Sequence, residues 1–496
     1  MMDLPTLLIL AVALPLVAAV AGLLAPRRLA EVLCYPASLA TVVVAVLIAL
    51  AVSQGQAPRV NVWTLTPGLD LALAGDALGV TFALLASGLW VVATVYSSGY
   101  VRAENLHHRP RFFMFFAASI GAAMGVALAA NLLTFLLFYE LLTLTTWPLV
   151  AHKQTPEAIA GGRRYLVFAL SAGVALTAAV VATWQITGTL DFVPGGFLAG
   201  RVSPAGMAAL FALFLLGCGV KAAVFPLHSW LPAAMVAPTP VSALLHAVAV
   251  VKAGVFGCIR IVAFVFGPDA LRDTWAIHVL AAACAVTIVF GSLMAIRQDH
   301  LKRRLAYSTV VQLSYVVLGA ALLAPYALAG AVLHMVNHGL AKITLFFCAG
   351  AIHAAQHVEN VSQLKGLGRR MPWTFAAFTV ASLGLIGLPG LCGFVGKFYL
   401  ARGAVESNQL GYLALLLSGS ILSAAYLLPI IRDACFGRAD TTGDAAHGHG
   451  EATPTMVVPI LMTTALVVVF GIVPAALAFQ YALASKVAAQ VFGVIP

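Results

Sequence analysis

The chain has 496 residues, of which 62% are hydrophobic and only 9% are charged. A soluble domain carries about 25% charged residues, so this composition excludes a soluble enzyme or binding module. The net charge of +10 comes from basic residues in short loops between apolar segments, and this distribution argues against a nucleic-acid partner.

Apolar runs of about 20 residues recur from end to end, and each is long enough to cross a lipid bilayer as a helix. The runs are continuous rather than alternating, which argues against a transmembrane β-barrel. We predict an all-α polytopic membrane protein with about fourteen transmembrane helices and a further apolar tail from Tyr481. The predicted helices span residues 4–25, 30–53, 77–100, 111–130, 131–151, 163–187, 205–229, 240–265, 274–296, 305–324, 326–353, 373–402, 409–432 and 455–480.

The basic residues of the loops predict the topology, because cytoplasmic loops are enriched in lysine and arginine. Alternate loops starting after the first helix hold Arg27, Arg28, Arg102, Arg109, Arg111, Lys153, Arg163, Arg164, Arg297, Lys302, Arg303, Arg304, Lys365, Arg369, Arg370, Arg432 and Arg438. The other loops hold only Arg59, Arg201, Arg272 and Arg402. We therefore expect a multi-pass protein of the inner (plasma) membrane with both termini outside the cytoplasm. The first segment lacks a clear cleavage site and is expected to remain as a helix.

Two predicted helices are interrupted. The seventh meets Pro226, Pro232 and Pro238, and the twelfth contains GLIGLPGLCGFVGK around Pro389. Proline removes a backbone hydrogen bond, and broken helices at matching places in two halves indicate a transporter's site. We predict inverted five-helix repeats, helices 4–8 and 9–13. The expected units are 1–110, 111–265, 274–436 and a polar loop with a C-terminal helix, 437–496.

Ionisable side chains inside the apolar runs are the candidate functional residues. Four lysines and one glutamate would together cost on the order of 12–17 kcal/mol if unpaired in lipid, which exceeds typical protein stability. They must therefore be paired, hydrated or neutralised. A lysine in an apolar interior can exchange its proton near neutral pH, and a carboxylate nearby opposes that loss.

Glu140 and Lys221 are the first candidate pair. Glu140 lies within NLLTFLLFYELLTLTTWPLV, where only another helix can supply its partner. Lys221 precedes the break at Pro226, where freed carbonyl groups leave room for water. We expect Glu140 to be the counter-charge of Lys221, and the alternative is a structural ion pair or a lysine that snorkels to the interface.

The eighth and eleventh helices carry the other candidates. His246 and Lys252 are six residues apart and face about 120° from each other, so both can border a wide polar cavity. His334, His338 and Lys342 step by four residues and form one polar stripe about 12 Å long. Neutral histidines pass protons at physiological pH, so we expect a proton relay.

Lys397, after the break in the twelfth helix, is expected to be an exit group. A zinc or haem site on the histidines is the rival, but His-x3-His lacks a third ligand and no HExxH occurs. The seven cysteines form no CxxC, and we expect buried thiols without disulfides. We therefore predict no cofactor and no metal, and treat the loop histidines His447 and His449 as part of a solvated linker.

The run KAAVFPLHSWLPAAMVAPTPVSALLHAVAVVKAG, from Lys221 to Gly254, resembles the signature of proton-translocating antiporter-like subunits. Such subunits occur in respiratory complex I, Mrp-type sodium/proton antiporters and membrane-bound hydrogenases. HMVNHGLAK and GFVGKFYL are similar to motifs of the family's eleventh and twelfth helices. The resemblance spans roughly residues 70–435. It implies that the site residues are Glu140, Lys221, His246, Lys252, His334, His338, Lys342 and Lys397.

Lysine at position 397 resembles the D-type member of Mrp antiporters and the other complex I members, whereas the central complex I member is known for glutamate there. The segment VAHKQTPEAIAGGRRYL also resembles D-type members of hydrogenase-type complexes. The resemblance implies an ion-translocating subunit that is not an enzyme by itself and that couples protons to Na⁺. Its expected partners are other membrane subunits. The alternatives are a redox-driven pump of a complex I-like or hydrogenase enzyme, a haem-binding cytochrome, and a subunit of an inorganic-carbon uptake complex.

Overall fold

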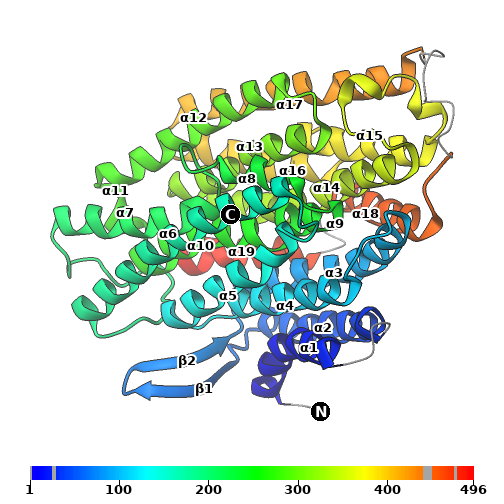
Figure 1. Cartoon of the computed structure of the whole chain (residues 1–496). Coiled ribbons are helices and arrows are strands. Elements are labelled where there is room, and N and C mark those ends of the chain that lie inside the picture. Colours follow the sequence, from blue (N-terminus) through cyan, green and yellow to red (C-terminus); the bar gives the residue numbers. More distant parts are fainter. Residues whose placement is uncertain (1–2, 25–28, 439–449, 474–477) are drawn as a thin grey trace.

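The computed structural model describes residues 3–24, 29–438, 450–473 and 478–496, and most of them lie in long helices that run side by side (Figure 1). The unbroken long helices are α1 (Leu4–Leu24), α2 (Leu29–Ser53), α3 (Ala77–Ala103), α4 (Arg109–Ala127), α5 (Leu132–Val150), α6 (Pro156–Thr187), α7 (Pro204–Lys221), α12 (Trp275–Arg297), α13 (Leu301–Ala321), α14 (Pro325–Gln356), α17 (Leu410–Phe436) and α18 (Pro454–Ile472). The chain is therefore an all-α polytopic membrane protein, as predicted.

Shorter elements complete the bundle. They are α8 (Trp230–Ala233), η1 (Ala234–Val236), α9 (Thr239–Ala243), η2 (Leu244–Val248), α10 (Val250–Arg260), η3 (Ile261–Phe266), α11 (Pro268–Arg272), η4 (Val361–Gln363), η5 (Leu367–Arg369), α15 (Pro372–Ile386), α16 (Cys392–Glu406) and α19 (Ala478–Phe492). The elements η2 and η3 are π-helical turns, so the span from Thr239 to Phe266 is one helix that widens twice.

Within the described residues, twelve helical spans are long and apolar enough to cross a membrane. The prediction of fourteen adds two more. One is α13, which begins with the basic run Lys302–Arg304, and the other is the pair α15 and α16, with 15 residues each. Both α13 and the pair α15 and α16 pack against other spans. The two numbers of spans differ because α13 contains basic residues and because a break divides the predicted twelfth helix, and not because the chain follows another path.

Polar caps explain where several helices begin. Asp76 accepts a hydrogen bond from the Gly79 amide at 2.7 Å, and Asn131 accepts one from the Thr134 amide at 2.9 Å. Thr155 caps α6 just before Pro156, a residue suited to the first helical turn. The predicted start of this helix at residue 163 is therefore wrong, and Arg163 and Arg164 lie within α6 rather than in a loop.

A β-hairpin between α2 and α3 was not predicted. Its strands β1 (Arg59–Thr66) and β2 (Leu69–Ala74) are antiparallel and project from the bundle (Figure 1). The sequence does carry its signal, because Pro67 and Gly68 form the turn between two short runs with alternating side chains.

The two helices predicted to be interrupted are both broken, and the fourteenth ends earlier than expected. The seventh ends at Lys221, five residues before Pro226, and the twelfth is split between Ile386 and Cys392. In that split Gly387 has φ = 96°, a left-handed conformation that favours glycine and ends α15. The fourteenth, predicted to span 455–480, ends at Ile472, and α19 begins at Ala478.

Two helices form the centre of the bundle. The apolar cores of the span Thr239–Phe266 and of α14 are completely buried inside the protein, whereas the corresponding parts of the other spans are 28–78% buried. Since these two helices have protein on every side, polar residues on them face other helices and not lipid. The inverted repeats proposed from the sequence stay a prediction.

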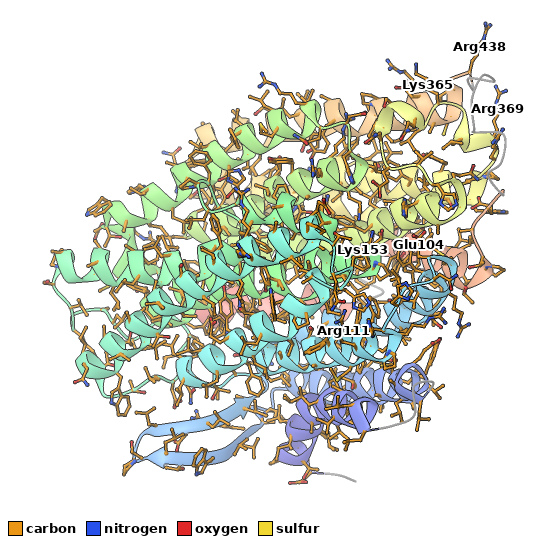
Figure 2. The ribbon with its side chains drawn as sticks, viewed as in Figure 1. Glu104, Arg111, Lys153, Lys365, Arg369 and Arg438 are labelled. Carbon is orange, nitrogen blue, oxygen red and sulfur yellow. The ribbon has the colours of Figure 1, made fainter. Side chains whose placement is uncertain are left out.

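The basic loops gather at one end of the helices, here called the basic end. Figure 2 shows Glu104, Lys365, Arg369 and Arg438 there, and the β-hairpin lies toward the other end (Figure 1). This arrangement agrees with the alternation of basic loops in the sequence. Arg27 and Arg28 lie outside the described residues, and the orientation of the termini stays a prediction.

A buried ion pair joins α3 to α10. The Arg260 guanidinium, 1% exposed, lies 2.5 Å and 2.8 Å from the two carboxylate oxygens of Asp76. Three phenylalanine rings surround the guanidinium at 4.8–5.1 Å. The sequence alone does not pair these two residues, although both are ionisable groups at helix ends.

We expect Asp76→Asn to lower the free energy of unfolding by about 3–5 kcal/mol, because it leaves the Arg260 charge buried without a counter-charge. The amide oxygen can still cap α3, so the change isolates the ion pair. The matched control is Asp191→Asn, which breaks an exposed pair with Arg59 and should change stability by about 0–1 kcal/mol. Thermal unfolding in detergent measures both variants, and equal melting temperatures would contradict the expectation.

Candidate functional site

Lys221 is the last residue of α7 and is completely buried. Its Nζ donates a hydrogen bond to the carbonyl oxygen of Tyr139 at 2.5 Å and lies 3.4 Å from the centre of the Tyr139 ring. Both contacts come from α5 and favour a cationic amine. Close packing of α10 beside Lys221 depends on Gly254, where a Cβ would overlap the backbone of Lys221 and Ala222.

Glu140 is the residue after Tyr139 on α5, whose carbonyl binds Lys221. Among the described residues no ion pair of 4.0 Å or less joins Glu140 to Lys221. The carboxyl instead lies against α6, where a Cβ on Gly173 would come within 2.8 Å of it. One oxygen, Oε1, is buried and has no hydrogen-bond partner among the described residues. The predicted pairing therefore stays a prediction, and a change of side-chain conformation would be needed to form it.

Lys252 bridges the two central helices. It is completely buried on α10, and its Nζ lies 2.5 Å from Nδ1 of His338 on α14. A hydrogen bond between an amine and an imidazole nitrogen needs one donor and one acceptor. The proton on this bond is thus held between two carriers on different helices.

His246 lies on the π-helical turn η2, one turn and a half before Lys252. Its Nδ1 lies 2.9 Å from the hydroxyl of Thr309 on α13, and its ring packs on Phe346 with 4.6 Å between centroids. Its Nε2 is buried without a partner among the described residues. His246 and Lys252 thus face different neighbours, as their spacing predicts, and do not contact each other.

The polar stripe predicted on α14 is present. His334 and His338 have ring centroids 6.3 Å apart, and Nε2 of His334 lies 2.9 Å from Oε1 of Gln312. Lys342 donates to the Leu305 carbonyl at 2.8 Å and to the Ser308 hydroxyl, both on α13. All three α14 residues are buried. The stripe therefore faces α13, and His338 alone reaches across to α10.

Lys397 lies on α16 just after the break between α15 and α16. Its Nζ donates to the carbonyls of Leu385 at 2.8 Å and Ile386 at 3.1 Å, and to the Ser420 hydroxyl at 3.1 Å. A cation at a helix C-terminus neutralises the negative end of the helix dipole and satisfies its free carbonyls. The ammonium group thus closes the end of α15 and uses all three of its donors.

The predicted residues, here called the axis, lie on helices that pack against one another, but they do not form one continuous contact. Direct contacts join Lys252 to His338, and within the described residues none joins Lys221 to Lys252 or Lys342 to His246. Buried nitrogens without a protein partner occur at His246, His334 and His338. Buried polar groups normally find a partner, so these atoms mark where the axis would bind water.

Sequence reasoning missed two residues that bind members of the axis, and it misplaced Lys302. Gln312 joins His334 to Ser423, Thr309 binds His246, and Lys302 donates to the Ala237 carbonyl at 3.0 Å. The prediction puts Lys302 in a loop because it starts α13 too late. The signal for Gln312 was available, since an amide in the middle of an apolar span needs a partner.

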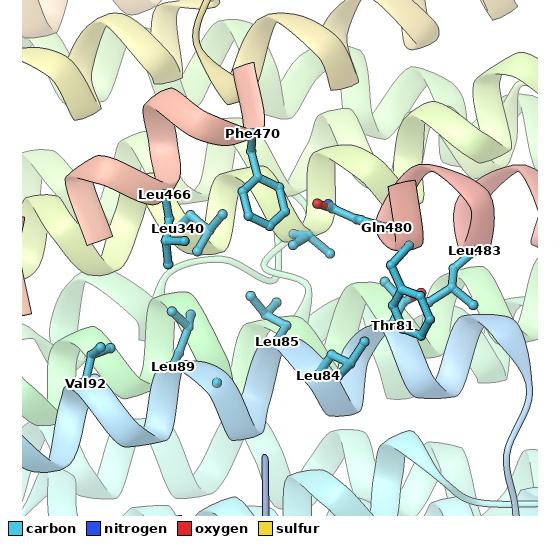
Figure 3. A pocket seen from close by; sticks show the side chains of 13 residues that line it. Thr81, Leu84, Leu85, Leu89, Val92, Leu340, Leu466, Phe470, Gln480 and Leu483 are labelled. Carbon is cyan, nitrogen blue, oxygen red and sulfur yellow. The ribbon is translucent and has the colours of Figure 1, made fainter. Parts of the chain in front are cut away.

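A cavity of about 310 Å³ lies between α3, α14, α18 and α19 (Figure 3). Leucine, valine and phenylalanine side chains form most of its wall, and Thr81 and Gln480 are the polar exceptions. Gln480 closes one side, where its amide lies 3.4 Å from Oδ1 of Asn337. Such a wall does not suit an ion, so the cavity is not part of the axis.

The described residues contain no group of three or more His, Cys, Asp or Glu side chains that could hold a metal ion. His447 and His449 lie outside the described residues. All seven cysteines are free thiols, six of them buried and Cys435 half-buried.

Comparison with known proteins shows the family to which the chain belongs. A family model described as "NADH:quinone oxidoreductase/Mrp antiporter, TM" matches residues 129–423, which include all eight predicted site residues. Subunit N of NADH-quinone oxidoreductase from Desulforudis audaxviator (strain MP104C) is 32% identical over 442 residues, covering 86% of this chain and 87% of the relative. A probable K(+)/H(+) antiporter subunit from Rhizobium meliloti (strain 1021) is 32% identical over 423 residues, covering 83% of this chain and 41% of the relative.

Two solved structures share the fold. The Mrp complex from Dietzia sp. DQ12-45-1b contains a chain that superposes with a TM-score of 0.88 at 22% identity, covering 100% of this chain and 99% of that one. A chain of the membrane-bound sulfane sulfur reductase, an archaeal respiratory membrane complex, superposes with a TM-score of 0.86 at 24% identity, covering 98% and 97%. These relatives are parts of multi-subunit membrane complexes, and the resemblance found in the sequence is confirmed. The chain belongs to the NADH:quinone oxidoreductase/Mrp antiporter family of transmembrane proteins.

Proposed function

We propose that this chain conducts protons through the membrane as one subunit of a multi-subunit complex, and that it couples them to a monovalent cation as in Mrp-type Na⁺/H⁺ antiport. The observation that carries the proposal is the row of protonatable side chains on two helices without lipid contact. Groups that cannot reach a headgroup or bulk water have only each other, and bound water, with which to exchange protons.

The contacts support the following order for the transfers. A proton that reaches His246 or Lys252 passes over the 2.5 Å contact to His338 and along α14 to His334. Lys397 is the next carrier, and losing its proton would free the carbonyls at the end of α15. Lys221 is held by the Tyr139 carbonyl, and rotation of Glu140 toward it would stabilise the protonated amine. Water molecules bridge the remaining gaps in this route.

The expected partners are other membrane subunits, and the expected location is the plasma membrane with both termini outside the cytoplasm. The name of the K(+)/H(+) antiporter relative supports cation coupling, and Lys397 favours the role of a D-type Mrp member. A redox-driven proton pump is the second candidate, because subunit N of NADH-quinone oxidoreductase matches along most of its length. The described contacts contain no site that selects Na⁺ over K⁺.

Vesicles containing the purified native complex distinguish the candidates. A pH-sensitive dye inside the vesicles reports an imposed pH gradient, to which NaCl, KCl or choline chloride is added. Antiport predicts that Na⁺ collapses the gradient within seconds and that choline has no effect. If none of the added cations changes the imposed gradient, and a pH gradient forms when NADH or another electron donor is added, redox-driven pumping replaces antiport as the function.

A further inference from the structure

Four titratable side chains outside the axis form a chain at the basic end, here called the entrance cluster. Glu104 lies at the C-cap of α3, His353 in the last turn of α14, Glu359 after α14, and His300 before α13. Nε2 of His353 lies 3.3 Å from Glu104 Oε2, and its Nδ1 lies 3.5 Å from Glu359 Oε1. Nε2 of His300 lies 3.7 Å from the other Glu359 oxygen.

The exposure of these side chains decreases from the surface inward. Glu359 is 44% exposed, His300 24%, His353 22% and Glu104 17%. Glu359, which contacts both histidines, is thus the most exposed member, and the contacts lead from it through His353 to the less exposed Glu104. The other charged or titratable groups that act on it are Lys153, Lys302, Arg303 and His357.

The surrounding charges keep Glu104 ionised and His300 uncharged near neutral pH. Burial alone would raise the pKa of Glu104, but the hydrogen bond and charge of His353, together with Lys153 and His357, hold this pKa below its usual range. Burial and the nearby charge of Lys302 lower the pKa of His300. At neutral pH Glu104 is therefore a carboxylate, and His353 lies between it and the carboxyl group of Glu359, at 3.3 Å and 3.5 Å.

Polar groups lead inward from the entrance cluster. Tyr100 lies one turn before Glu104, and its hydroxyl oxygen accepts a hydrogen bond from Thr239 at 3.3 Å. Thr239, Ser242 and His246 are spaced by three and four residues, which places them on one face of the same helix. The Ser242 hydroxyl and Nε2 of His246 are buried without a protein partner among the described residues. The polar face therefore runs from the entrance cluster to the first carrier of the axis.

We propose that Glu359, His300, His353 and Glu104 collect protons from water at the basic end and deliver them along Tyr100, Thr239 and Ser242 to His246. The inference rests on the proposed proton conduction and adds the group that supplies it. Supply matters because water at about pH 8 holds about 10⁻⁸ M protons. Even at a diffusion limit of about 10¹⁰ M⁻¹s⁻¹, a single acceptor captures only about 100 protons per second. This rate is within the range of enzyme turnover, so the capture of protons can limit transport.

The test compares proton flux in vesicles containing the purified complex, with wild-type chain, Glu104→Gln/Glu359→Gln and the control Glu157→Gln. Glu157 is an exposed acid at the same end, in the first turn of α6, outside the cluster. In weak buffer above neutral pH the double variant should be slower by about tenfold, while the control equals wild type. A high concentration of imidazole, a mobile proton carrier, should restore the double variant to the wild-type rate.

The outcomes separate this inference from the function on which it rests. If the wild-type complex moves protons and the double variant matches it at every pH in weak buffer, the entrance cluster does not collect protons, although conduction stands. If the double variant is slow at every pH and imidazole does not restore it, the cluster is a structural clamp. If the wild-type complex moves no protons in either direction, the proposed function and this inference fail together.

Discussion

Replacing Lys221 with methionine is expected to reduce proton translocation by about 100-fold or more, while the complex still assembles. Methionine has a similar length and no exchangeable proton, so it can fill the site on Tyr139 without carrying charge. The variant removes a buried amine whose contacts are the Tyr139 carbonyl and ring, so folding should not suffer. Flux in reconstituted vesicles measures the effect, and native gel electrophoresis measures assembly.

The matched control for Lys221→Met is Lys486→Met. Lys486 also donates to a backbone carbonyl, that of Val52 at 2.6 Å, but it lies on α19 away from the axis. This variant should transport at the wild-type rate. Glu140→Ala should abolish transport as Lys221→Met does, because the amine then has no carboxylate to stabilise its protonated form. Normal transport in both axis variants would remove Glu140 and Lys221 from the mechanism.

The second large effect is expected from Lys252→Met, which should also lower translocation by about 100-fold or more. The Lys252–His338 contact is the described hydrogen bond that joins the two central helices through two protonatable groups. Without the amine, the imidazole of His338 has no partner on α10, and protons that enter at His246 have no direct route to α14. Flux measured as for Lys221 reports the loss.

Two further variants separate conduction from packing at this contact. Lys252→Met/His338→Leu removes both polar groups, so it leaves no unpaired donor or acceptor there and should assemble normally but remain inactive. His278→Gln, at an exposed position on α12, should behave as wild type. Activity of the double variant at more than a small fraction of the wild-type rate would show that protons bypass this pair.

Much of the fold follows from composition alone, because a span that must be apolar for about 20 residues is easily recognised. Predicted helix 30–53 differs from α2 by one residue, and helix 77–100 begins where α3 begins. The errors arise where polar residues belong to a helix. The starts of α6 and α13 carry basic residues that the topology rule assigns to loops, and the widening of Thr239–Phe266 by π-helical turns has no clear sequence signal.

The sequence predicts which residues belong to the candidate site better than it predicts which of them contact each other. An ionisable residue in an apolar run has few explanations other than function, which identified Lys221, Lys252 and Lys397. Which groups meet depends on rotation of helices and on rotamers, and these are set by packing among distant segments. The contact of Lys221 with the Tyr139 carbonyl rather than with the neighbouring carboxyl is an example. The roles of these residues stay predictions until transport is measured.

The central position of α14 has a consequence for the biosynthesis of the protein. Its most apolar part has a mean hydropathy of 1.3, the lowest of the twelve spans, against 2.8 for α1. The three protonatable residues in its middle, His334, His338 and Lys342, would each oppose partition into lipid from the translocon. The amine of Lys342 binds groups on α13, and Nδ1 of His338 binds Lys252 on α10; both helices are synthesised earlier. The helices that carry the polar partners of α14 are thus synthesised before α14 leaves the ribosome.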